Sequence, residues 1–326
     1  MNRFSGKRVL ITGATGLIGS HLVKLLLDEG ATVIAHGRTE GKLKKVFENN
    51  LKNEKFSYVI GNISEKIPEI VGEVDYIFHA ASPISGTEIK FKPVDTISTN
   101  IDGTINCLQY LKQQGHGRMI VFSSATVYGN QFMENITVTE EETDKADALH
   151  TANTPYSESK RMIEVLARAY ATQYEVDSVI VRIGYVYGYS NPRPNTAFYE
   201  FIGKAISGDD ITLNNSGMGR RDNIHVNDVV NGLLLVAEKG ITGESYNISS
   251  NGDAGNFRAI DEIAEVIASV VNKLDTQKSV KAVIKPYEGE RKPGMKLDNK
   301  KAKELGWDIK VGLEDGITET IKEYMK

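Results

Sequence analysis

A tyrosine and a lysine stand four residues apart in the segment TPYSESK, which runs from Thr154 to Lys160. Positions i and i+4 share one face of a helix, so Tyr156 and Lys160 can reach the same ligand. A free tyrosine has a pKa of about 10, and a nearby ammonium group favours its phenolate. Such a pair can move a proton to or from an alcohol. Because the chain has 14 tyrosines, this spacing is expected roughly once by chance, and other motifs must support it.

Hydroxyl groups that could share this site follow the apolar run from Met119 to Phe122, in the segment VFSSATVYGN. Ser123, Ser124 and Thr126 are the candidates, because a second hydroxyl would polarise the substrate oxygen on which the tyrosine acts. Lys160 could also hold the ribose of a cofactor. The sequence therefore predicts a site that oxidises an alcohol or reduces a ketone.

The segment LITGATGLIGSH places Gly13, Gly16 and Gly19 between an apolar strand and an amphipathic helix. Glycines suit a sharp turn that a phosphate must approach closely, and a helix N-terminus offers unpaired N–H groups to the phosphate. The spacing is G-x-x-G-x-x-G rather than the commoner G-x-G-x-x-G. In this context the loop predicts a dinucleotide-binding site.

The end of the second strand, AHGRTEGK, bears on the choice between the two nicotinamide dinucleotides. An acidic residue there would bind the adenosine ribose and repel a 2′-phosphate. Gly37 and Arg38 occupy this place, and the first acid is Glu40. Because Arg38 can pair with a phosphate through two hydrogen bonds, we expect NADP to be preferred to NAD.

Alternating strands and helices in the first half predict an α/β fold, a doubly wound parallel sheet of the Rossmann type. Apolar runs without alternation, such as 9–11 and 119–122, indicate strands that are buried on both faces. A loop rich in Pro, Asn and Ser follows Gly188. We expect a dinucleotide-binding domain at 1–188, to which part of 221–250 returns, and a smaller substrate-binding lobe, mainly at 189–326.

Composition narrows the function classes. The net charge is −4, and no apolar run is long enough to span a bilayer, so we expect neither nucleic acid nor a membrane as a partner. The N-terminus enters a strand pattern at once, which predicts no signal peptide and a cytoplasmic protein. Cys107 is the only cysteine, and the six histidines lack metal-ligand spacing, so no metal is expected.

Several motifs occur in a characteristic order: TGATGLIG, VDYIFHAAS, NIDGTIN, SSATVYG and YSESK. Together they resemble extended short-chain dehydrogenase/reductases. GMGRRDNIHVNDV and KAKELGW are similar to segments of nucleotide-sugar enzymes in the NAD-dependent epimerase/dehydratase family. The resemblance implies a nucleotide-activated sugar as substrate, and a homodimer joined through helices near 95–112 and 155–174.

The same resemblance implies roles for individual residues. Tyr156 is expected as the proton donor or acceptor, Lys160 as its electrostatic partner and Ser124 as the hydrogen-bonding hydroxyl. Arg221 matches an arginine that holds substrate phosphate, and Arg291 lies where a second basic contact is usual. The glycine loop and the resemblance together give these cofactor-binding residues: Gly13, Thr15, Gly16, Leu17, Ile18, Gly19, Arg38, Asn62, Ile63, Ala80, Ala81, Ser82, Asn100, Tyr156 and Lys160.

The chain departs at several positions from the pattern of the enzymes that it resembles. Ala125 and Thr126 stand where the similar dehydratases carry an Asp-Glu pair, so 4,6-dehydration is disfavoured. Decarboxylases of uronic-acid nucleotides keep a glutamate where Thr126 stands, which makes decarboxylation a less favoured alternative. Tyr185 replaces a common substrate-facing asparagine, and Asn62 replaces the usual acid near the adenine.

We expect an NAD(P)-dependent nucleotide-sugar epimerase that transiently oxidises the C4 hydroxyl, with Tyr156 as acid and base. SSATVYG and RRDNIHVND favour this reading, whereas Arg38 favours the alternative, an NADPH-dependent 4-ketoreductase. A dinucleotide-sensing regulator without catalysis is the alternative from another class. The intact Ser124, Tyr156 and Lys160 argue against it, because a sensor needs no proton-transfer groups.

Overall fold

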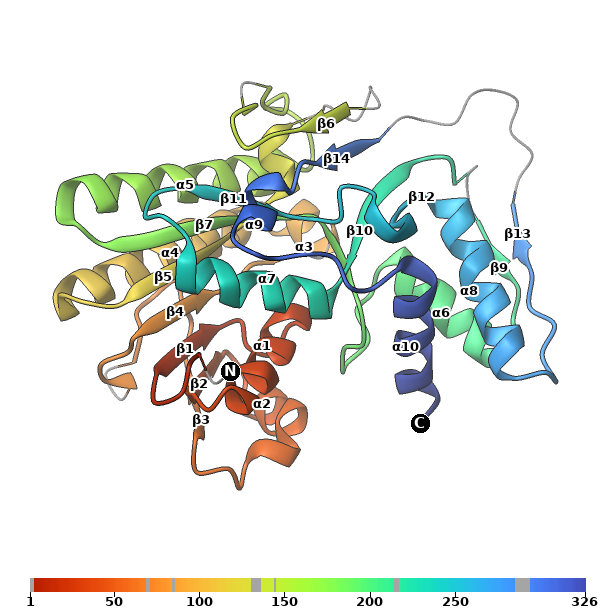
Figure 1. Ribbon diagram of the computed structural model, residues 1–326, viewed down its shortest axis with the longest axis horizontal. Coiled ribbons are helices and arrows are strands. Elements are labelled where there is room, and N and C mark those ends of the chain that lie inside the picture. The colour runs from red at the N-terminus through yellow and green to blue at the C-terminus, as the bar shows by residue number, and fades with distance from the viewer. Residues whose placement is uncertain are drawn as a thin grey trace.

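The computed structural model describes residues 3–68, 71–83, 86–129, 136–143, 145–213, 217–284 and 294–326. A parallel sheet of seven strands forms its centre, in the order β11-β7-β5-β4-β1-β2-β3 (Figure 1). The expected Rossmann-like α/β class is confirmed. The strands are β1 (Arg8–Thr12), β2 (Thr32–Gly37), β3 (Phe56–Ile60), β4 (Tyr76–His79), β5 (Arg118–Ser124), β7 (Asp177–Ile183) and β11 (Ser245–Ile248).

Both faces of the sheet are covered, which explains the unbroken apolar strands. Val9 and Ile11 of β1 join one buried cluster, whereas Leu10 between them joins another on the opposite face. The first cluster packs under α1 (Leu17–Asp28), α2 (Glu40–Val46) and α7 (Val226–Lys239). The second packs under α4 (Pro93–Gln114) and α5 (Thr154–Tyr174), which lie side by side in Figure 1.

The strand order reverses direction between β1 and β4, because β2 and β3 extend to one side of β1 while β4 and β5 extend to the other. In open α/β sheets, ligands bind outside the carboxyl ends of the strands at such a switch point. The glycine loop between β1 and α1 lies at this point. The topology therefore places the predicted dinucleotide site at the ends of β1 and β4.

A second group of elements lies beside this sheet (Figure 1). Its small sheet has the order β12-β10-β8, and a third buried cluster joins its three longer helices. The elements are β8 (Tyr185–Tyr187), α6 (Ala197–Ser207), β9 (Ile211–Thr212), β10 (Arg220–His225), β12 (Phe257–Ala259), α8 (Ile260–Leu274), β13 (Ala282–Val283) and α10 (Leu313–Met325).

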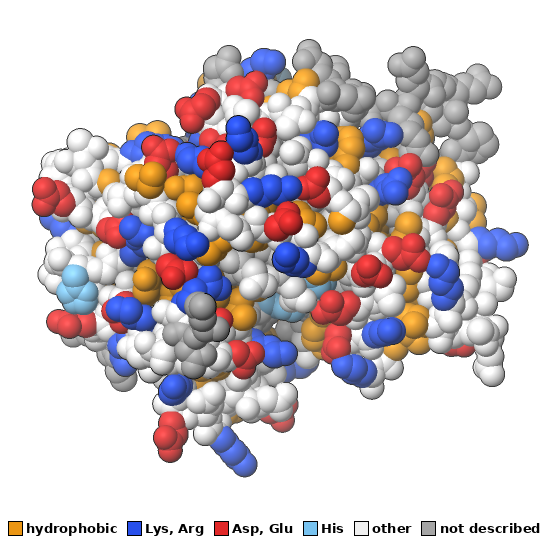
Figure 2. All heavy atoms as spheres, viewed as in Figure 1, with side chains coloured by type: hydrophobic (Ala, Val, Ile, Leu, Met, Phe, Trp, Pro, Cys, Tyr) orange, Lys and Arg blue, Asp and Glu red, His pale blue; other side chains and the backbone are white. Residues whose placement is uncertain are grey.

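Short elements complete the described chain. They are α3 (Gly86–Phe91), β6 (Ile136–Val138), β14 (Met295–Leu297), α9 (Lys300–Glu304) and the 3₁₀ helices η1 (Glu48–Asn50), η3 (Ala125–Tyr128) and η5 (Asp253–Gly255). Within the described ranges, no helix has the length and apolar character needed to cross a membrane. Figure 2 shows acidic and basic side chains interspersed over the visible face rather than segregated.

Candidate active site

The glycine loop is shaped by a close approach of two backbone segments. Gly13 has φ +64°, and a Cβ atom on it would lie 2.7 Å from the Cα of Ala81, in the segment after β4. A Cβ on Gly19 would lie 2.5 Å from the carbonyl oxygen of Gly13. Side chains at either position would push the loops apart. Gly13 therefore lets the β1–α1 loop lie against the segment after β4, and Gly19 lets the start of α1 lie against that loop.

The start of α1 fits a phosphate group. Gly16 is the N-cap residue, and no side chain caps the helix. The first-turn N–H groups, including those of Leu17, Ile18 and Gly19, have no partner within a helix of this kind and are available to an anion. Thr15 and Gly16 are at least partly exposed. These features fit the pyrophosphate of a dinucleotide.

Arg38 is exposed just after β2 and forms no hydrogen bond or ion pair with another described residue. Glu40, the nearest acid along the chain, is engaged elsewhere. Its carboxylate lies 2.8 Å from the Nζ of Lys44, and its Oε1 accepts a hydrogen bond of 3.0 Å from the Tyr58 hydroxyl. The Arg38 guanidinium is therefore not neutralised by the acid that follows it.

The loops after β3 and β4 carry further predicted cofactor residues. The Oδ1 of Asn62 accepts a hydrogen bond of 2.8 Å from the Ser64 hydroxyl, while Ile63 is buried. The backbone N–H groups of Ala80 and Ala81 donate to the carbonyl and the hydroxyl oxygen of Thr12. These contacts tie the ends of β1 and β4 together.

Asn100 is buried on α4, and its side chain connects that helix to α5. Its Nδ2 donates to the Ser159 hydroxyl over 2.7 Å, and that hydroxyl donates to the Tyr156 carbonyl over 2.8 Å. The Oδ1 of Asn100 is buried without a hydrogen-bond partner in the described structure. A buried unpaired oxygen is costly, so this atom is a candidate acceptor for a bound group.

Tyr156 and Lys160 are brought together on α5, but their electrostatics differ from the sequence-based expectation. Burial raises the pKa of Tyr156 above its ordinary value, although hydrogen bonds with the Ser124 and Ser82 side chains oppose this shift. Lys160 is buried, and burial lowers its pKa to about 7. Its Nζ donates to the carbonyl oxygen of Phe122 over 2.7 Å and lies 5.6 Å from the Tyr156 ring centre. The expected lowering of the Tyr156 pKa by Lys160 is therefore not present in this structure.

Ser124 lies at the end of β5, and Thr126 follows in η3, which packs against α5. The Ser124 Oγ accepts a hydrogen bond of 3.2 Å from the Thr126 backbone N–H and also interacts with the Tyr156 side chain. The Thr126 Oγ1 is buried without a partner in the described chain. Ser82, which sequence reasoning assigned to the cofactor, approaches the same tyrosine.

The second group of elements contributes Tyr185 and Arg221. The Arg221 guanidinium lies 5.0 Å from the Tyr185 ring centre, the geometry of a cation–π contact. Tyr185 is near enough to Tyr156 to raise the pKa of that tyrosine. The structure therefore groups Tyr156, Tyr185 and Arg221. Arg291 lies outside the described residues.

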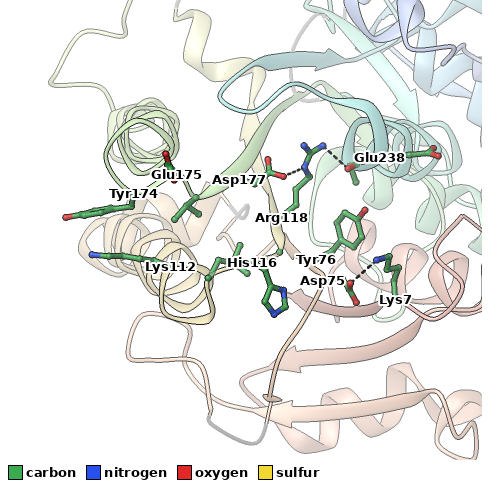
Figure 3. A pocket seen from close by; sticks show the side chains of 15 residues that line it. Lys7, Asp75, Tyr76, Lys112, His116, Arg118, Tyr174, Glu175, Asp177 and Glu238 are labelled. Carbon is green, nitrogen blue, oxygen red and sulfur yellow. Dashed lines mark hydrogen bonds and ion pairs between the residues drawn. The ribbon is translucent and has the colours of Figure 1, made fainter.

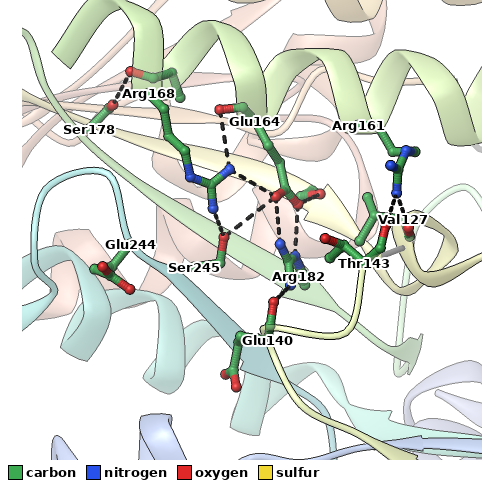
Figure 4. A network of polar contacts seen from close by, with 12 residues as sticks. Val127, Glu140, Thr143, Arg161, Glu164, Arg168, Ser178, Arg182, Glu244 and Ser245 are labelled. Carbon is green, nitrogen blue, oxygen red and sulfur yellow. Dashed lines mark hydrogen bonds and ion pairs between the residues drawn. The ribbon is translucent and has the colours of Figure 1, made fainter. Parts of the chain in front are cut away.

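Sequence reasoning missed a buried polar network around Glu164 of α5, the helix that also carries Tyr156 and Lys160 (Figure 4). The Glu164 carboxylate accepts hydrogen bonds from Ser123 Oγ at 2.6 Å, Arg182 Nε at 2.9 Å and Arg182 Nη2 at 2.8 Å. The spacing from Lys160 to Glu164 is another i, i+4 step along α5. That spacing was a signal in the sequence, but the arginine partner lies on β7.

Asp222, next to Arg221, was also missed. Its buried carboxylate accepts hydrogen bonds from the hydroxyls of Ser249 and Ser250 and from the backbone N–H of Leu297. These partners follow β11 or belong to β14. Asp222 therefore ties the strand that carries Arg221 to the edge of the large sheet.

A cavity of about 580 Å³ lies at the opposite end of the sheet, near the beginnings of β4, β5 and β7 (Figure 3). Lys7 pairs with Asp75 at 3.0 Å, and Arg118 pairs with Asp177 at 2.7 Å in its wall. It contains none of the predicted site residues. Among the described residues, no group of three or more His, Cys, Asp and Glu side chains is placed to hold a metal ion.

The chain is similar to several known proteins over nearly its whole length. UDP-glucuronic acid decarboxylase 6 of Arabidopsis thaliana is 33% identical over 319 residues, covering 96% of this chain and 87% of that protein. The structure of UDP-glucose 4-epimerase from Thermotoga maritima with UDP-glucose has a TM-score of 0.79, 26% identity and 98% coverage of both chains. The Bordetella bronchiseptica enzyme WbmF in complex with NAD+ and UDP has a TM-score of 0.77 and 25% identity, covering 99% of this chain and 93% of that chain.

A family model matches residues 9–249, which include the glycine loop, Ser124, Tyr156, Lys160 and Arg221. This match covers well over half of the chain, and the similarity to the Arabidopsis protein extends over nearly all of it. The protein therefore belongs to the NAD-dependent epimerase/dehydratase family.

Proposed function

We propose that this protein is a nucleotide-sugar epimerase that reversibly oxidises the C4 hydroxyl of its substrate. The observation that carries the proposal is the grouping of Tyr156 with the hydroxyls of Ser124 and Ser82, above the buried Lys160. The similarity to a UDP-glucose 4-epimerase over 98% of both chains supports a UDP-hexose as the substrate.

The chain supplies proton transfer and binding. The glycine loop and the start of α1 would hold a nicotinamide dinucleotide, and its chemistry would be reversible hydride exchange with the sugar carbon. Tyr156, as the phenolate, takes the hydroxyl proton, and Ser124 donates a hydrogen bond to the same oxygen. The Lys160 ammonium, 5.6 Å from the Tyr156 ring centre, stabilises the phenolate from its place beside β5. Tyr156 then returns its proton to the reduced ketone, so no net proton is consumed.

Net inversion requires the keto sugar to present its other face before the hydride returns. We assign Arg221 to the substrate phosphates and Tyr185 to the sugar side of the site, because these residues meet near Tyr156. Thr126 and Ala125 offer no second acid or base. Elimination of water needs one, so the residues favour simple hydride and proton transfer.

The first experiment is to denature the freshly purified protein and identify any released dinucleotide by chromatography and mass. An epimerase must keep its hydride carrier through the cycle, so a stoichiometric dinucleotide is expected. The purified protein is then incubated with UDP-glucose, and NMR should detect the C4 epimer without added cofactor. An empty protein that forms no epimer even with added NAD or NADP would contradict the proposal.

Decarboxylation is the second candidate, because the Arabidopsis relative is named a UDP-glucuronic acid decarboxylase and is 33% identical. Oxidation of a uronic acid at C4 gives a β-keto acid, which loses CO₂ readily. The same Tyr156, Ser124 and Lys160 would serve its oxidation step. Incubation with UDP-glucuronate separates the candidates, because a decarboxylase releases CO₂ and a UDP-pentose, whereas an epimerase preserves the carboxylate.

We further propose that the dinucleotide is preferentially NADP. The exposed Arg38, without a described partner, and the engagement of Glu40 by Lys44 and Tyr58 support this preference. If NADPH also dissociates freely and a 4-keto sugar is reduced in net turnover, the activity is that of the alternative ketoreductase. Tighter binding of NAD than of NADP would contradict the assigned preference.

A homodimer is the proposed assembly. Apolar side chains are exposed on adjoining helices, with Val94 of α4 at 74% and Val165 of α5 at 57%. Phe91, Ile97 and Met162 are exposed beside them. Burying such a surface against a second copy would be favourable. A variant carrying V94D and V165D should have a monomeric mass in solution, whereas a monomeric unmodified protein would contradict the proposal.

A further inference from the structure

The α5 helix carries four ionisable side chains at successive i, i+4 positions: Tyr156, Lys160, Glu164 and Arg168. The first two belong to the proposed chemistry, but the third does not reach the substrate. Glu164 is buried, with 4% of its surface exposed. A carboxylate buried to this extent requires compensating partners.

Those partners come from three neighbouring strands. Ser123 of β5 and Arg182 of β7 donate to the Glu164 carboxylate, and the Ser245 hydroxyl of β11 lies 3.5 Å from its Oε2. Arg168, one turn further along α5, lies 3.3 Å from Oε2 and donates to Ser245 over 2.7 Å. One carboxylate therefore fastens α5 to β5, β7 and β11, and Figure 4 shows Glu164 between Arg168, Arg182 and Ser245.

Few charged groups lie near Lys160. Glu164 is the α5 carboxylate whose charge acts on Lys160. Burial lowers the pKa of His79 on β4 and keeps it neutral, and the charge of Lys160 adds to that shift. β5 contributes the carbonyl oxygen of Phe122 rather than a charge. Burial lowers the pKa of Lys160, and the Glu164 charge opposes that shift. Although Arg182 and Arg168 neutralise much of the carboxylate, it remains the group that favours the ammonium form.

We propose that Glu164, held by Arg182, is a positioning residue that fixes Lys160 against β5 and keeps it positively charged. The proposal rests on the proposed function, because it assigns Glu164 an effect on the Tyr156–Lys160 pair. Burial raises the pKa of Glu164 itself, but the hydrogen bonds and charge of Arg182 outweigh burial and place the pKa below its ordinary value. Glu164 therefore stays ionised through the neutral range.

The test is the pH dependence of kcat/KM for Glu164→Gln, measured from about pH 6 to about pH 9, where a group near neutrality titrates. Without the carboxylate charge, Lys160 should lose its proton at lower pH. The fall in kcat/KM at high pH should therefore begin at lower pH. The ratio of kcat/KM at about pH 6 to kcat/KM at about pH 8 should rise on the order of tenfold relative to the unmodified enzyme.

Two matched variants separate charge from structure. Glu164→Asp keeps the charge. Its kcat/KM should therefore fall at the same high pH as that of the unmodified enzyme (the high-pH limb of the pH profile), even if its melting temperature falls. Glu158→Gln removes a charge from the same helix, where Glu158 pairs with Arg161 rather than Lys160, and should not move the limb. A Glu164→Gln enzyme that loses the same factor at every pH would overturn the proposal.

If Glu164→Gln does not fold, the double variant E164Q/R182Q removes both ions and leaves no unpaired buried arginine. Its high-pH limb should also move to lower pH, and an unmoved limb would again overturn the proposal. Tyr156→Phe separates this inference from the proposed function. An active Tyr156→Phe enzyme refutes the proposed chemistry, whereas an inactive one together with an unmoved limb refutes only the role of Glu164.

Discussion

The two ends of the seven-stranded sheet both carry charged side chains, but they use them differently. At the amino end, Lys7 pairs with Asp75, and Arg118 pairs with Asp177. At the carboxyl end, Arg38 has no described ionic partner, and Lys160 donates to a backbone carbonyl. A cavity lies at the amino end, and these two ion pairs lie in its wall. The proposed site therefore rests on Arg38, which is unpaired among the described residues, on the buried Lys160 and on the switch point rather than on cavity volume.

The largest predicted difference in turnover is between Tyr156→Phe and a substitution at the amino end of the sheet. Without its hydroxyl, residue 156 cannot exchange a proton with the substrate, and turnover should fall by at least about 10²-fold, the usual contribution of acid–base catalysis. Dinucleotide binding should remain. Steady-state rates and dinucleotide titration measure the two effects, and a Tyr156→Phe enzyme with unchanged kcat would remove the proposed mechanism.

Arg38→Ala tests whether the unpaired charge at the carboxyl end recognises a 2′-phosphate. Loss of a hydrogen bond to a charged group costs about 1.5–3 kcal/mol, so NADP affinity should fall by roughly 10- to 100-fold. NAD affinity should change little. Lys45→Ala, an exposed cation on α2, is the control and should preserve the ratio. Equal weakening of NAD and NADP by Arg38→Ala would show that the arginine does not discriminate between them.

At the amino end, Asp177→Asn should reduce stability without changing the chemistry. Its carboxylate accepts hydrogen bonds from Arg118 at 2.7 Å and from the Thr242 hydroxyl at 2.6 Å. Because the site is partly exposed, the expected loss in the free energy of unfolding is about 1 kcal/mol. Denaturant unfolding measures this loss. A large fall in kcat at unchanged stability would mean that the amino-end cavity takes part in the reaction.

The smallest expected effect is that of Asp75→Asn, because the Lys7–Asp75 pair is substantially exposed. We expect a loss of up to about 1 kcal/mol in the free energy of unfolding at neutral pH. Burial raises the pKa of Asp75, but hydrogen bonds from the Arg8 N–H and Lys7 outweigh it, and the pKa lies below the ordinary value of 3.8. The stabilisation is therefore present above that value and fades as the pH falls below it. An undiminished difference from the unmodified protein in strong acid would contradict this assignment.

The sheet and the glycine loop could be predicted because their signals are local. Three of these signals are continuous stretches of sequence: the apolar strands that are buried on both faces, the glycine triplet before an amphipathic helix, and the Tyr156–Lys160 spacing. Such local patterns predict the backbone conformation and the side-chain direction without reference to tertiary contacts.

The remaining features depend on residues that only folding brings together. The Glu164–Arg182 pair joins a helix to a strand, and Asp222 gathers partners from after β11 and from β14. The burial that raises the pKa of Tyr156 and lowers that of Lys160 also arises from tertiary packing. The spacing in the sequence therefore identified Tyr156 and Lys160 as a pair, but it did not predict how burial shifts their pKa values.

The most direct test of the proposed reaction uses a nucleotide hexose that carries deuterium at C4. The proposed oxidation and return of the same hydride predict a C4 epimer that keeps its deuterium, with a slowed rate, as read by NMR and mass. A C4 epimer that has exchanged its deuterium for solvent hydrogen would contradict transient hydride transfer at C4.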